Sequence, residues 1–285
     1  MSRIAYVNGR YVPRRDATVH VEDRGYQFAD GVYEVCEVRG GRLIDERRHM
    51  ARLQRSLTEL RIALPMPLNA LSVVMHEVVL RNGVRDGIVY LQVTRGVAKR
   101  DHAFPAAGTR PAIVVTANRI DPEKTERLAA DGIAVITLPD NRWDRVDIKS
   151  IALLPNVLAK QAAREQGARE AWFVDSDGYV TEGSSSNAWI VTADGDVVTR
   201  QADQAILKGI TRTVLLGLLK SHDLKLKERP FTVEEAQAAR EAFITSASQT
   251  VMPVVKIDDR PVGNGAPGLV ASALRKDFHR FAEQS

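Results

Sequence analysis

The first part of the chain alternates short apolar stretches with turn signals. Residues 4–7 run into an Asn-Gly dipeptide at 8–9, which strongly indicates a two-residue β-hairpin turn. Residues 32–38 alternate apolar and polar side chains, and two glycines at 40–41 then turn the chain toward a short apolar pair at 43–44. These patterns predict two β-hairpins.

From Arg47 onward, apolar positions recur at the spacing of an α-helix. Two amphipathic helices are predicted, the first ended by Pro65 and the second ending near Asn82. Their apolar stripes consist of Met50, Leu53, Leu57 and Leu60 in the first helix, and of Leu68, Leu71, Met75 and Val78 in the second. Strand patterns return at residues 88–94 and 112–116.

Residues 118–125 (NRIDPEKT) are the most linker-like stretch, because they are polar and contain Pro122. Strand patterns dominate again beyond this stretch, with helical patterns between them. The strands are predicted at 133–138, 171–174, 187–191, 242–245 and 254–257, and the helices at 156–166, 211–221 and 232–239. The last helix begins with a capping box made by Thr232 and Glu235.

This order of elements predicts an α+β fold in two domains. A chain of 285 residues is longer than a single hydrophobic core usually needs. We place an N-terminal domain at 1–117, a linker at 118–125 and a C-terminal domain, richer in strand, at 126–285. No G-x-G-x-x-G motif follows a strand, so the pattern does not indicate a doubly wound nucleotide-binding sheet.

Composition narrows the class of protein further. The single Cys36 excludes an intrachain disulfide and fits a reducing cytoplasm, and without a CxxC or HExxH motif no metal site is predicted. The N-terminal residues lack the apolar region of a signal peptide, and no apolar run approaches the ~18 residues of a membrane span. We therefore expect a soluble cytoplasmic protein that does not bind a membrane.

The isoelectric point, near 9.2, does not by itself indicate nucleic-acid binding. The net charge is only +4, from 40 basic and 36 acidic residues that are interspersed along the chain. Aromatic residues are sparse, so no platform for stacking bases is evident. A modest positive charge is better suited to small anionic ligands.

Two segments carry residues suited to carbonyl chemistry, and each also has a plain structural interpretation. Lys149 lies among apolar neighbours in VDIKSI, where an amine shielded from water is nucleophilic toward a carbonyl. The alternative is a surface lysine on an amphipathic strand. Glu182 lies in TEGSSSN, where a carboxylate could keep the ring nitrogen of a cofactor protonated. The alternative for Glu182 is a polar turn.

Three further groups could bind anions. Residues 209–211 precede an apolar run, so free N–H groups at a helix start could bind a phosphate, unless the threonine is simply an N-cap. Arg52 lies among other arginines of a predicted helix, for which a solvated face is the alternative. Arg100 and His102 lie in the loop RDHAFP, which could hold a carboxylate or be an exposed basic loop.

The order of these segments resembles that of the D-amino-acid aminotransferases, within the branched-chain aminotransferase-like group of fold type IV. The likeness covers essentially the whole chain, including DRGYQFADGVYEV, VTRGVAKRDHAFP, VDIKSIALLPNVLAKQAA, VTEGSSSNAWIV and ILKGITRTVLL. DIKS and TEGSSSN are specific to the broad group, whereas the RDHAFP loop points to its D-specific members. The resemblance implies a smaller N-terminal α/β domain and a larger, strand-rich C-terminal pseudo-barrel.

The resemblance also implies pyridoxal 5'-phosphate as the cofactor. Lys149 would form the Schiff base and carry the substrate proton, and Glu182 would pair with the ring nitrogen. The cofactor would further contact Arg52, Leu207, Ile210, Thr211, Ser246 and Ala247, and the substrate carboxylate would contact Tyr33, Arg100 and His102. Ala247 stands where the group usually has a threonine at the phosphate, which leaves that contact to a backbone N–H or to Ser248.

The implied activity is ping-pong transamination, with D-alanine and 2-oxoglutarate giving pyruvate and D-glutamate. Arg100 and His102 would come from the neighbouring subunit, so the resemblance implies a homodimer. Within the same cofactor class the alternatives are a branched-chain L-amino-acid aminotransferase, an aminodeoxychorismate lyase and an (R)-amine transaminase. Outside this class there are two alternatives, a non-catalytic binding module that kept the fold and a basic nucleic-acid binder. The presence of Lys149 and Glu182 argues against the binding module.

Overall fold

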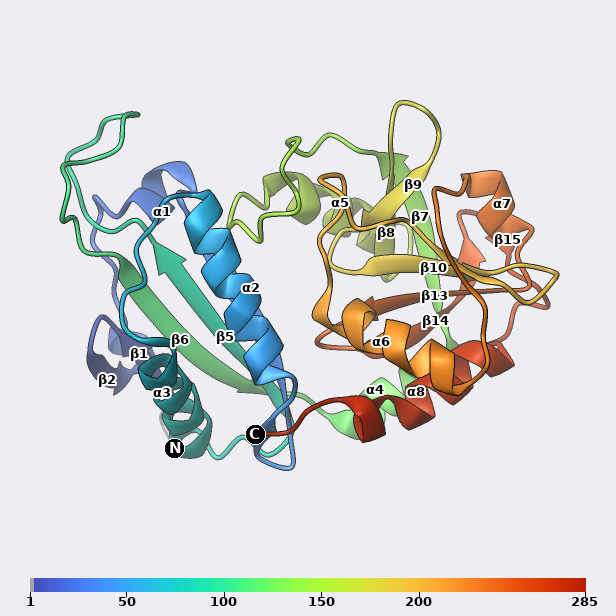
Figure 1. Cartoon of the computed structure of the whole chain (residues 1–285), viewed down its shortest axis with the longest axis horizontal. Coiled ribbons are helices and arrows are strands. Elements are labelled where there is room, and N and C mark those ends of the chain that lie inside the picture. The colour runs from blue at the N-terminus through green and yellow to red at the C-terminus, as the bar shows by residue number, and fades with distance from the viewer. Residues whose placement is uncertain (1–2) are drawn as a thin grey trace. The chain divides into compact units, whose positions relative to one another are not determined.

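The computed structural model describes residues 3–285 and divides the chain into two units, each with its own β-sheet (Figure 1). The first unit runs to Pro122 and also contains Ile148–Ala152 and Glu283–Ser285. The second unit comprises Glu123–Asp147 and Leu153–Ala282. The observed elements confirm the α+β class that the sequence pattern predicts.

An antiparallel sheet of six strands forms the centre of the first unit. Its strand order is β2 (Arg10–Pro13), β1 (Ile4–Val7), β6 (Ala112–Arg119), β5 (Gly87–Thr94), β3 (Gly31–Arg39) and β4 (Arg42–Leu43). A 3₁₀ turn (Arg14–Asp16) and the short helix α1 (Arg24–Phe28) lie between β2 and β3 along the chain. The longer helices α2 (Glu46–Glu59) and α3 (Leu68–Arg81) pack on the sheet. Both predicted hairpins are confirmed, as β1–β2 and β3–β4.

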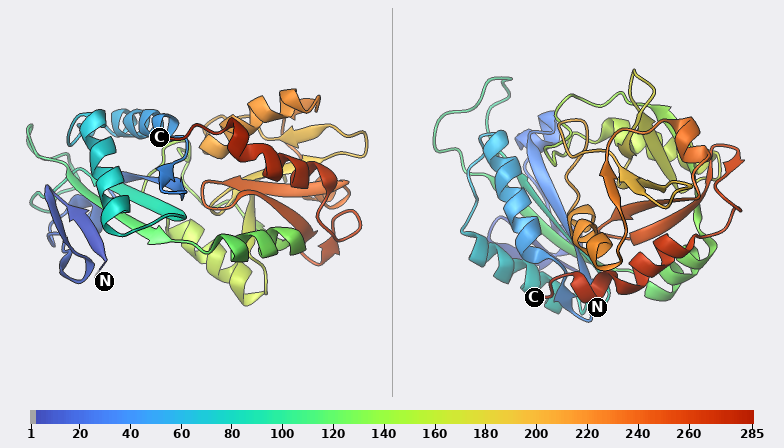
Figure 2. Two further views of the ribbon diagram at one scale, coloured as in Figure 1. Left: turned by 90° about the horizontal axis from the view of Figure 1, so that it is seen from below. Right: turned by 45° about the vertical axis from the view of Figure 1, so that its right-hand side comes forward.

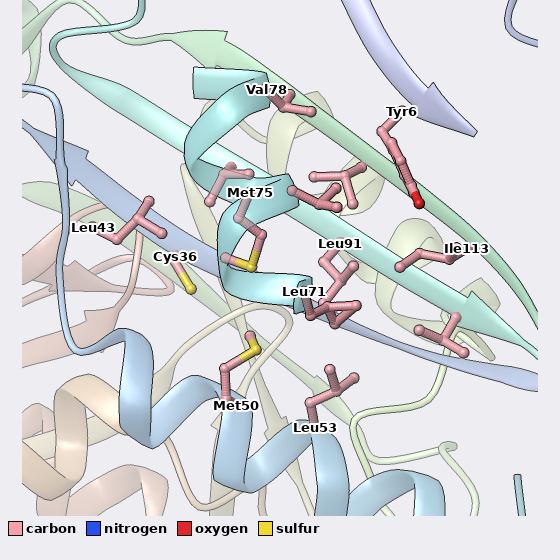
Figure 3. Close-up of a cluster of buried hydrophobic side chains, with 14 of the residues drawn as sticks. Tyr6, Cys36, Leu43, Met50, Leu53, Leu71, Met75, Val78, Leu91 and Ile113 are labelled. Atoms are coloured by element: carbon pink, nitrogen blue, oxygen red, sulfur yellow. The ribbon is translucent and has the colours of Figure 1, made fainter. Parts of the chain in front are cut away.

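The core of the first unit lies between these two helices and the sheet (Figure 3). The predicted apolar stripes of α2 and α3 supply Leu53 and Met75, and β3 and β5 supply Cys36 and Leu91; all four are fully buried. Along β3 every second residue faces inward, from Val32 through to the end of the strand. This alternation confirms the predicted strand, whose side chains point alternately to the two faces of the sheet.

A mixed sheet of nine strands forms the second unit. Its main path is β12 (Leu226–Glu228), β11 (Val197–Thr199), β10 (Asn187–Val191), β13 (Glu241–Ser246), β14 (Thr250–Ile257), β7 (Ile133–Pro139), β8 (Glu170–Val174) and β9 (Val180–Gly183), with β15 (Arg260–Pro261) paired to β14. The pairs β11–β12, β14–β7 and β7–β8 are parallel, and the others are antiparallel. Because β9 also contacts β10, the sheet curls back on itself, in keeping with the expected pseudo-barrel.

Five helices accompany this sheet. They are α4 (Pro122–Asp131), α5 (Leu154–Glu165), α6 (Ile210–Ser221), α7 (Val233–Gln237) and α8 (Leu269–Phe281). Helices α6 and α8, orange and red in Figure 2, pack on each other and on β13. Their inner faces form one buried apolar cluster with that strand.

The structure differs from the sequence-based expectation in two places near the unit boundaries. Residues 118–125 are not an extended linker, because β6 continues to Arg119 and α4 begins at Pro122. A proline suits the first turn of a helix, where its missing N–H would have no partner, so the same residue signals a linker and a helix start. In addition, Ile148–Ala152 groups with the first unit although its neighbours in the chain belong to the second.

The pattern also left several elements without a prediction, namely α1, α4, α8, β9, β11, β12 and β15. Among residues 3–285, every helix is too short or too polar to cross a lipid bilayer. Within the same range, no group of three or more His, Cys, Asp and Glu side chains is arranged to hold a metal ion.

Of the two hydrogen bonds expected for the capping box at α7, the one accepted by the Thr232 side chain is present. The Thr232 hydroxyl accepts a hydrogen bond of 3.1 Å from the Glu235 N–H, whereas the Glu235 carboxylate pairs with Arg229. We expect Thr232→Ala to lower the free energy of unfolding by about 1 kcal/mol, measured by urea denaturation, because the helix loses its N-cap. Thr58→Ala, on the exposed side of α2, is the matched control and should change the value by less than about 0.5 kcal/mol. Equal effects of the two substitutions would contradict the cap.

Candidate active site

The segment that carries Lys149 is attached to β3 through its backbone. The Lys149 carbonyl accepts a hydrogen bond of 3.0 Å from the Tyr33 N–H, and the Ile151 N–H donates to the Gly31 carbonyl at 3.1 Å. A side chain at Gly31 could not be accommodated, since its Cβ would lie 2.6 Å from the Val93 carbonyl oxygen. The backbone around Lys149 is therefore fixed against the start of a central strand.

The Lys149 side chain extends over an aromatic ring. Its Nζ atom lies 4.1 Å from the centre of the Tyr33 ring, which in turn stacks on Tyr90 at 5.7 Å. Burial, with a smaller contribution from Tyr33, raises the pKa of Tyr90 to about 12, so this hydroxyl stays neutral at physiological pH. Among the described residues of the first unit, no carboxylate forms an ion pair with Lys149, which leaves its half-buried amine available to react with a carbonyl.

Next to Tyr33 on β3, Glu34 faces the interior of the first unit and anchors two side chains of α2. Its carboxylate accepts hydrogen bonds of 2.7 Å from Arg52 Nε and Arg52 Nη2, and it lies 2.7 Å from His49 Nδ1. His49 and Arg52 are three residues apart, so both project from one face of the helix. The Arg52 side chain is 9% exposed, unlike those of Arg47 and Arg55, which are 83% and 45% exposed. The solvated-face interpretation thus holds for Arg47 and Arg55 and fails for Arg52.

Opposing effects set the charge of this buried cluster. Burial alone would raise the pKa of Glu34, but the positive charge of Arg52 and hydrogen bonds from Arg52 and His49 hold it at about 2. Burial lowers the pKa of His49 despite its contact with Glu34, so the imidazole is neutral at physiological pH. Arg52 and Glu34 therefore form a largely buried ion pair between the helix and the sheet.

The loop that carries Arg100 and His102 is exposed and lies beside α1. The Arg100 guanidinium stacks 4.7 Å from the centre of the Phe28 ring, and the His102 ring lies 5.4 Å from it. The buried Arg24 donates hydrogen bonds to the carbonyls of Asp101, at 2.6 Å, and His102, at 3.4 Å. The structure thus brings Arg100 and His102 together on the ring of Phe28.

A buried ion-pair network supports the base of this loop. Asp30 accepts hydrogen bonds from Arg24 at 2.8 Å and from Arg95 at 2.7 and 2.9 Å. The Arg95 guanidinium also lies 3.8 Å from the centre of the Phe104 ring, within the same loop. Burial alone would raise the pKa of Asp30, but the two arginines lower it, so the network stays ionised at neutral pH.

In the second unit, donors from Arg142, Asn187 and Leu207 hold the buried carboxylate of Glu182. Arg142 Nη1 donates at 2.6 Å to one oxygen, and the other accepts from Asn187 Nδ2 at 3.0 Å and from the Leu207 N–H at 3.1 Å. Glu182 lies on strand β9, so the polar-turn interpretation of TEGSSSN is wrong for this residue. The three serines that follow donate to the buried carboxylate of Glu170, which fixes the connection between β9 and β10.

Asn187 links Glu182 to the start of helix α6. Its Nδ2 group also donates a hydrogen bond of 2.9 Å to the Leu207 carbonyl. A Cβ atom at Gly209 would lie only 2.1 Å from the Asn187 Oδ1 atom. Only glycine fits at position 209, and this N-cap residue has no side chain to occupy the free N–H groups of the first turn. The N-terminus of α6, with Ile210 and Thr211, therefore offers an anion site next to the Glu182 network.

Strand β13 ends at Ser246, and Ala247 begins the turn that leads to β14. Asn187 pairs with Thr245 in the β10–β13 ladder, so Ser246 follows at the same end of the sheet as Asn187. The Ser246 and Ser248 hydroxyls lie 3.5 Å apart across Ala247. The alanine thus has a hydroxyl on either side, and the contact that the family usually makes with a threonine at this position stays a prediction.

Sequence reasoning missed several residues of these networks, among them Glu34, His49, Asn187, and Arg142 with its second partner Asp140. For Glu34 a signal existed, because its carboxylate is in phase with the inward positions of β3. Nothing local marks Arg142, which lies among alternating charges and meets Glu182 only through the pairing of β7, β8 and β9. The role of each predicted site residue stays a prediction.

Comparison with known proteins identifies the family. The model of the amino-transferase class IV family matches residues 31–257. A D-alanine aminotransferase of Bacillus licheniformis is 44% identical over 261 residues, which cover 92% of this chain and 90% of that protein. One of Staphylococcus haemolyticus is 39% identical over 279 residues, which cover 98% and 97%.

The solved structures agree with this assignment. A branched-chain amino acid aminotransferase of T.th., solved with pyridoxamine 5'-phosphate, is similar with a TM-score of 0.89. Its sequence is 27% identical, and the match covers 98% of this chain and 94% of that one. With more than half of its length matched by the family model, the chain belongs to the class IV aminotransferases.

Proposed function

We propose that this aminotransferase uses pyridoxal 5'-phosphate to transaminate D-amino acids, converting D-alanine and 2-oxoglutarate into pyruvate and D-glutamate. The main support is the state of the Lys149 amine. It is half-buried over the Tyr33 ring and forms no ion pair with a carboxylate in the described part of its own unit. The names of the Bacillus licheniformis and Staphylococcus haemolyticus relatives support the D-alanine assignment, as does the RDHAFP loop.

The residues present fit this cofactor. It needs an amine to bind its aldehyde, an acid for its ring nitrogen and a site for its phosphate. Lys149 supplies the amine, the buried Glu182 carboxylate supplies the acid, and the uncapped N-terminus of α6 supplies N–H donors. When bound, the cofactor provides the electron sink that stabilises negative charge at the substrate Cα.

Each residue then has a defined task. Lys149 would carry the proton that leaves Cα, because an amine that is not held in an ion pair can accept and return it. Glu182, fixed by Arg142, Asn187 and the Leu207 N–H, would hold a proton on the ring nitrogen. The side chain of Leu207 would pack against the ring, since its backbone is tied to the same carboxylate.

The phosphate would bind to N–H groups at Ile210 and Thr211, with the hydroxyl groups that flank Ala247 nearby in the fold. Because Glu34 engages the Nε and Nη2 atoms of Arg52, we expect this arginine to add positive potential rather than a bidentate clamp. Such a role differs from the direct contact that the family resemblance implies.

Recognition of the substrate carboxylate would fall to Tyr33, Arg100 and His102. Arg100 and His102 share the Phe28 ring in an exposed loop, and we propose that this loop is donated to the site of a second subunit. We therefore propose a homodimer as the working assembly, in the cytoplasm. Holding the carboxylate on one side of Lys149 would leave only one enantiomer with its Cα–H directed at the amine.

The decisive experiment compares D-alanine with L-alanine as donor to 2-oxoglutarate, using purified protein. We expect pyruvate formation from the D-enantiomer to exceed that from the L-enantiomer by at least about a hundredfold, since about 2.7 kcal/mol of differential positioning suffices. Efficient use of L-leucine without D-alanine would indicate a branched-chain L-aminotransferase instead. Release of pyruvate from aminodeoxychorismate would indicate a lyase, and turnover of amines without a carboxylate an (R)-amine transaminase.

A further inference from the structure

A buried arginine joins Glu182 to a second carboxylate, Asp140. Arg142 donates to Asp140 through Nε at 2.9 Å and through Nη2 at 2.7 Å, while its Nη1 atom donates to Glu182 at 2.6 Å. The Arg142 side chain is only 5% exposed. It therefore bridges two acids in a place with little water to screen their charges.

The surroundings hold this chain of charges in one arrangement. Asp140 accepts a hydrogen bond of 2.8 Å from the Thr181 hydroxyl, and Thr181 precedes Glu182 on β9. The Asp140 N–H donates to the Val174 carbonyl of β8 at 2.8 Å, and Arg142 lies over the Phe173 ring. Each partner thus belongs to the β7–β9 part of the sheet, which fixes the distances between the three charges.

The charges of the three groups do not cancel. Burial alone would raise the pKa of Asp140, but Arg142 lowers it, so Asp140 is anionic at neutral pH. Hydrogen bonds and charges from Asp140 and Glu182 outweigh burial and raise the pKa of Arg142. With Glu182 ionised, two carboxylates and one guanidinium carry a net charge of −1. Without Asp140, the pair of Arg142 and Glu182 would carry no net charge.

We propose that Asp140 and Arg142 are positioning residues for Glu182. Arg142 orients the Glu182 carboxylate, and Asp140 offsets the positive charge of Arg142. The inference rests on the proposed function, because it assigns Glu182 to the ring nitrogen of the cofactor. It predicts that the pH at which the ring nitrogen loses its proton depends on the net charge of Asp140, Arg142 and Glu182. The identity of each side chain should matter less.

Three variants separate charge from structure. Asp140→Asn brings the net charge to zero, Arg142→Gln brings it to −2, and the double variant Asp140→Asn/Arg142→Gln returns it to −1. The holoenzyme is prepared with pyridoxal 5'-phosphate labelled with ¹⁵N at the ring nitrogen, and its ¹⁵N resonance is followed from about pH 5 to 10, a range that brackets neutral pH. This resonance reports protonation of the nitrogen directly and does not depend on turnover.

The expected results follow the charge count. Asp140→Asn should lower the pH midpoint of ring-nitrogen deprotonation by about one unit, a tenfold change in the equilibrium, because a negative charge in a poorly screened place is lost. Its kcat with D-alanine should fall about tenfold. The double variant should recover the wild-type midpoint, and Arg142→Gln should raise it. Asp175→Asn is the matched control, since it removes the charge of another aspartate of the same unit, one that pairs with Arg200 at 2.7 Å.

The other outcomes overturn the inference in distinguishable ways. A double variant that behaves worse than both single variants would assign the pair a purely structural role. Identical ¹⁵N midpoints in all variants, with a wild-type enzyme that transaminates D-alanine, would overturn the charge role and leave the proposed function intact. If the wild-type protein does not bind pyridoxal 5'-phosphate, both the charge role of Asp140 and Arg142 and the proposed function are refuted.

Discussion

Replacing Lys149 by alanine is expected to lower transaminase turnover by at least about four orders of magnitude. The same amine would bind the cofactor and move the substrate proton, and general acid–base catalysis alone supplies about 10²–10⁴-fold. We expect no other lysine to take its place, because the backbone of this segment is fixed against β3 and Nζ lies over the Tyr33 ring. The measurement is single-turnover conversion of D-alanine by the variant and by the wild-type protein.

Borohydride reduction gives a second, independent readout of the Lys149 variant. In the wild-type protein we expect peptide mass analysis to find the reduced cofactor on Lys149, and in the variant on no lysine. Lys276→Ala is the matched control, because Lys276 is exposed on helix α8 and alanine suits a helix. Full turnover in the Lys149 variant, or the reduced cofactor on another lysine of the wild-type protein, would refute the assignment.

The second large effect is expected on stability, from Glu34→Gln. The substitution would leave the positive charge of Arg52 buried without the Glu34 counterion and would place an amide N–H₂ group against donors of Arg52 and His49. Breaking one half of a buried ion pair typically costs about 3–5 kcal/mol. The pKa of Glu34 leads to a similar figure, because the difference between 4.5 and about 2, at about 1.36 kcal/mol per pKa unit, corresponds to about 3 kcal/mol.

The pH dependence of this contribution has a definite sign. Since the pKa of Glu34 is lower in the folded than in the unfolded chain, its stabilising effect is fully present above about pH 4.5. The effect is lost progressively as the pH falls toward about 2, because the folded state must then take up a proton. Urea denaturation between about pH 3 and 7 should therefore show a steeper loss of stability in the wild-type protein than in Glu34→Gln.

Glu77→Gln serves as the matched control, because Glu77 forms a 2.6 Å pair with Arg81 on the partly exposed side of α3. Exposed pairs of this kind contribute only about 0–1 kcal/mol. We expect Glu77→Gln to leave both the free energy of unfolding at neutral pH and its acid dependence nearly unchanged. Equal stability of Glu34→Gln and wild-type protein would show that the buried pair does not stabilise the fold.

Local periodicity accounts for most of the elements that could be predicted. The two hairpins, helices α2 and α3, and the strands with continuous apolar runs follow from side-chain spacing, because the buried face of each element repeats with its own geometry. Strand β9 escaped prediction because its four residues carry a threonine, a glutamate and a glycine, all of which are buried by long-range pairing rather than by their own polarity.

The charged networks lie beyond the reach of such patterns. Glu34 and Arg52 are separated by 18 positions, and Arg142 and Glu182 by 40. A sequence pattern reports which residues repeat with a helix or a strand, but it does not report which charge from another element lies opposite them. Arg52 illustrates the limit, because the nearby arginines Arg47 and Arg55 are exposed while its own side chain is buried against Glu34.

Local sequence patterns were enough to predict the α+β class, the main elements and the family, and they singled out Lys149 and Glu182 as candidate cofactor residues. These depend on spacing and on motifs of consecutive residues, both of which are local. Only the tertiary structure decided that Ile148–Ala152 belongs with β3, that Glu34 holds Arg52, and that Arg142 connects Glu182 to Asp140. Such contacts join segments that are far apart in the sequence. Sheet pairing and core packing bring these segments together, and a local sequence pattern does not show which segments will meet.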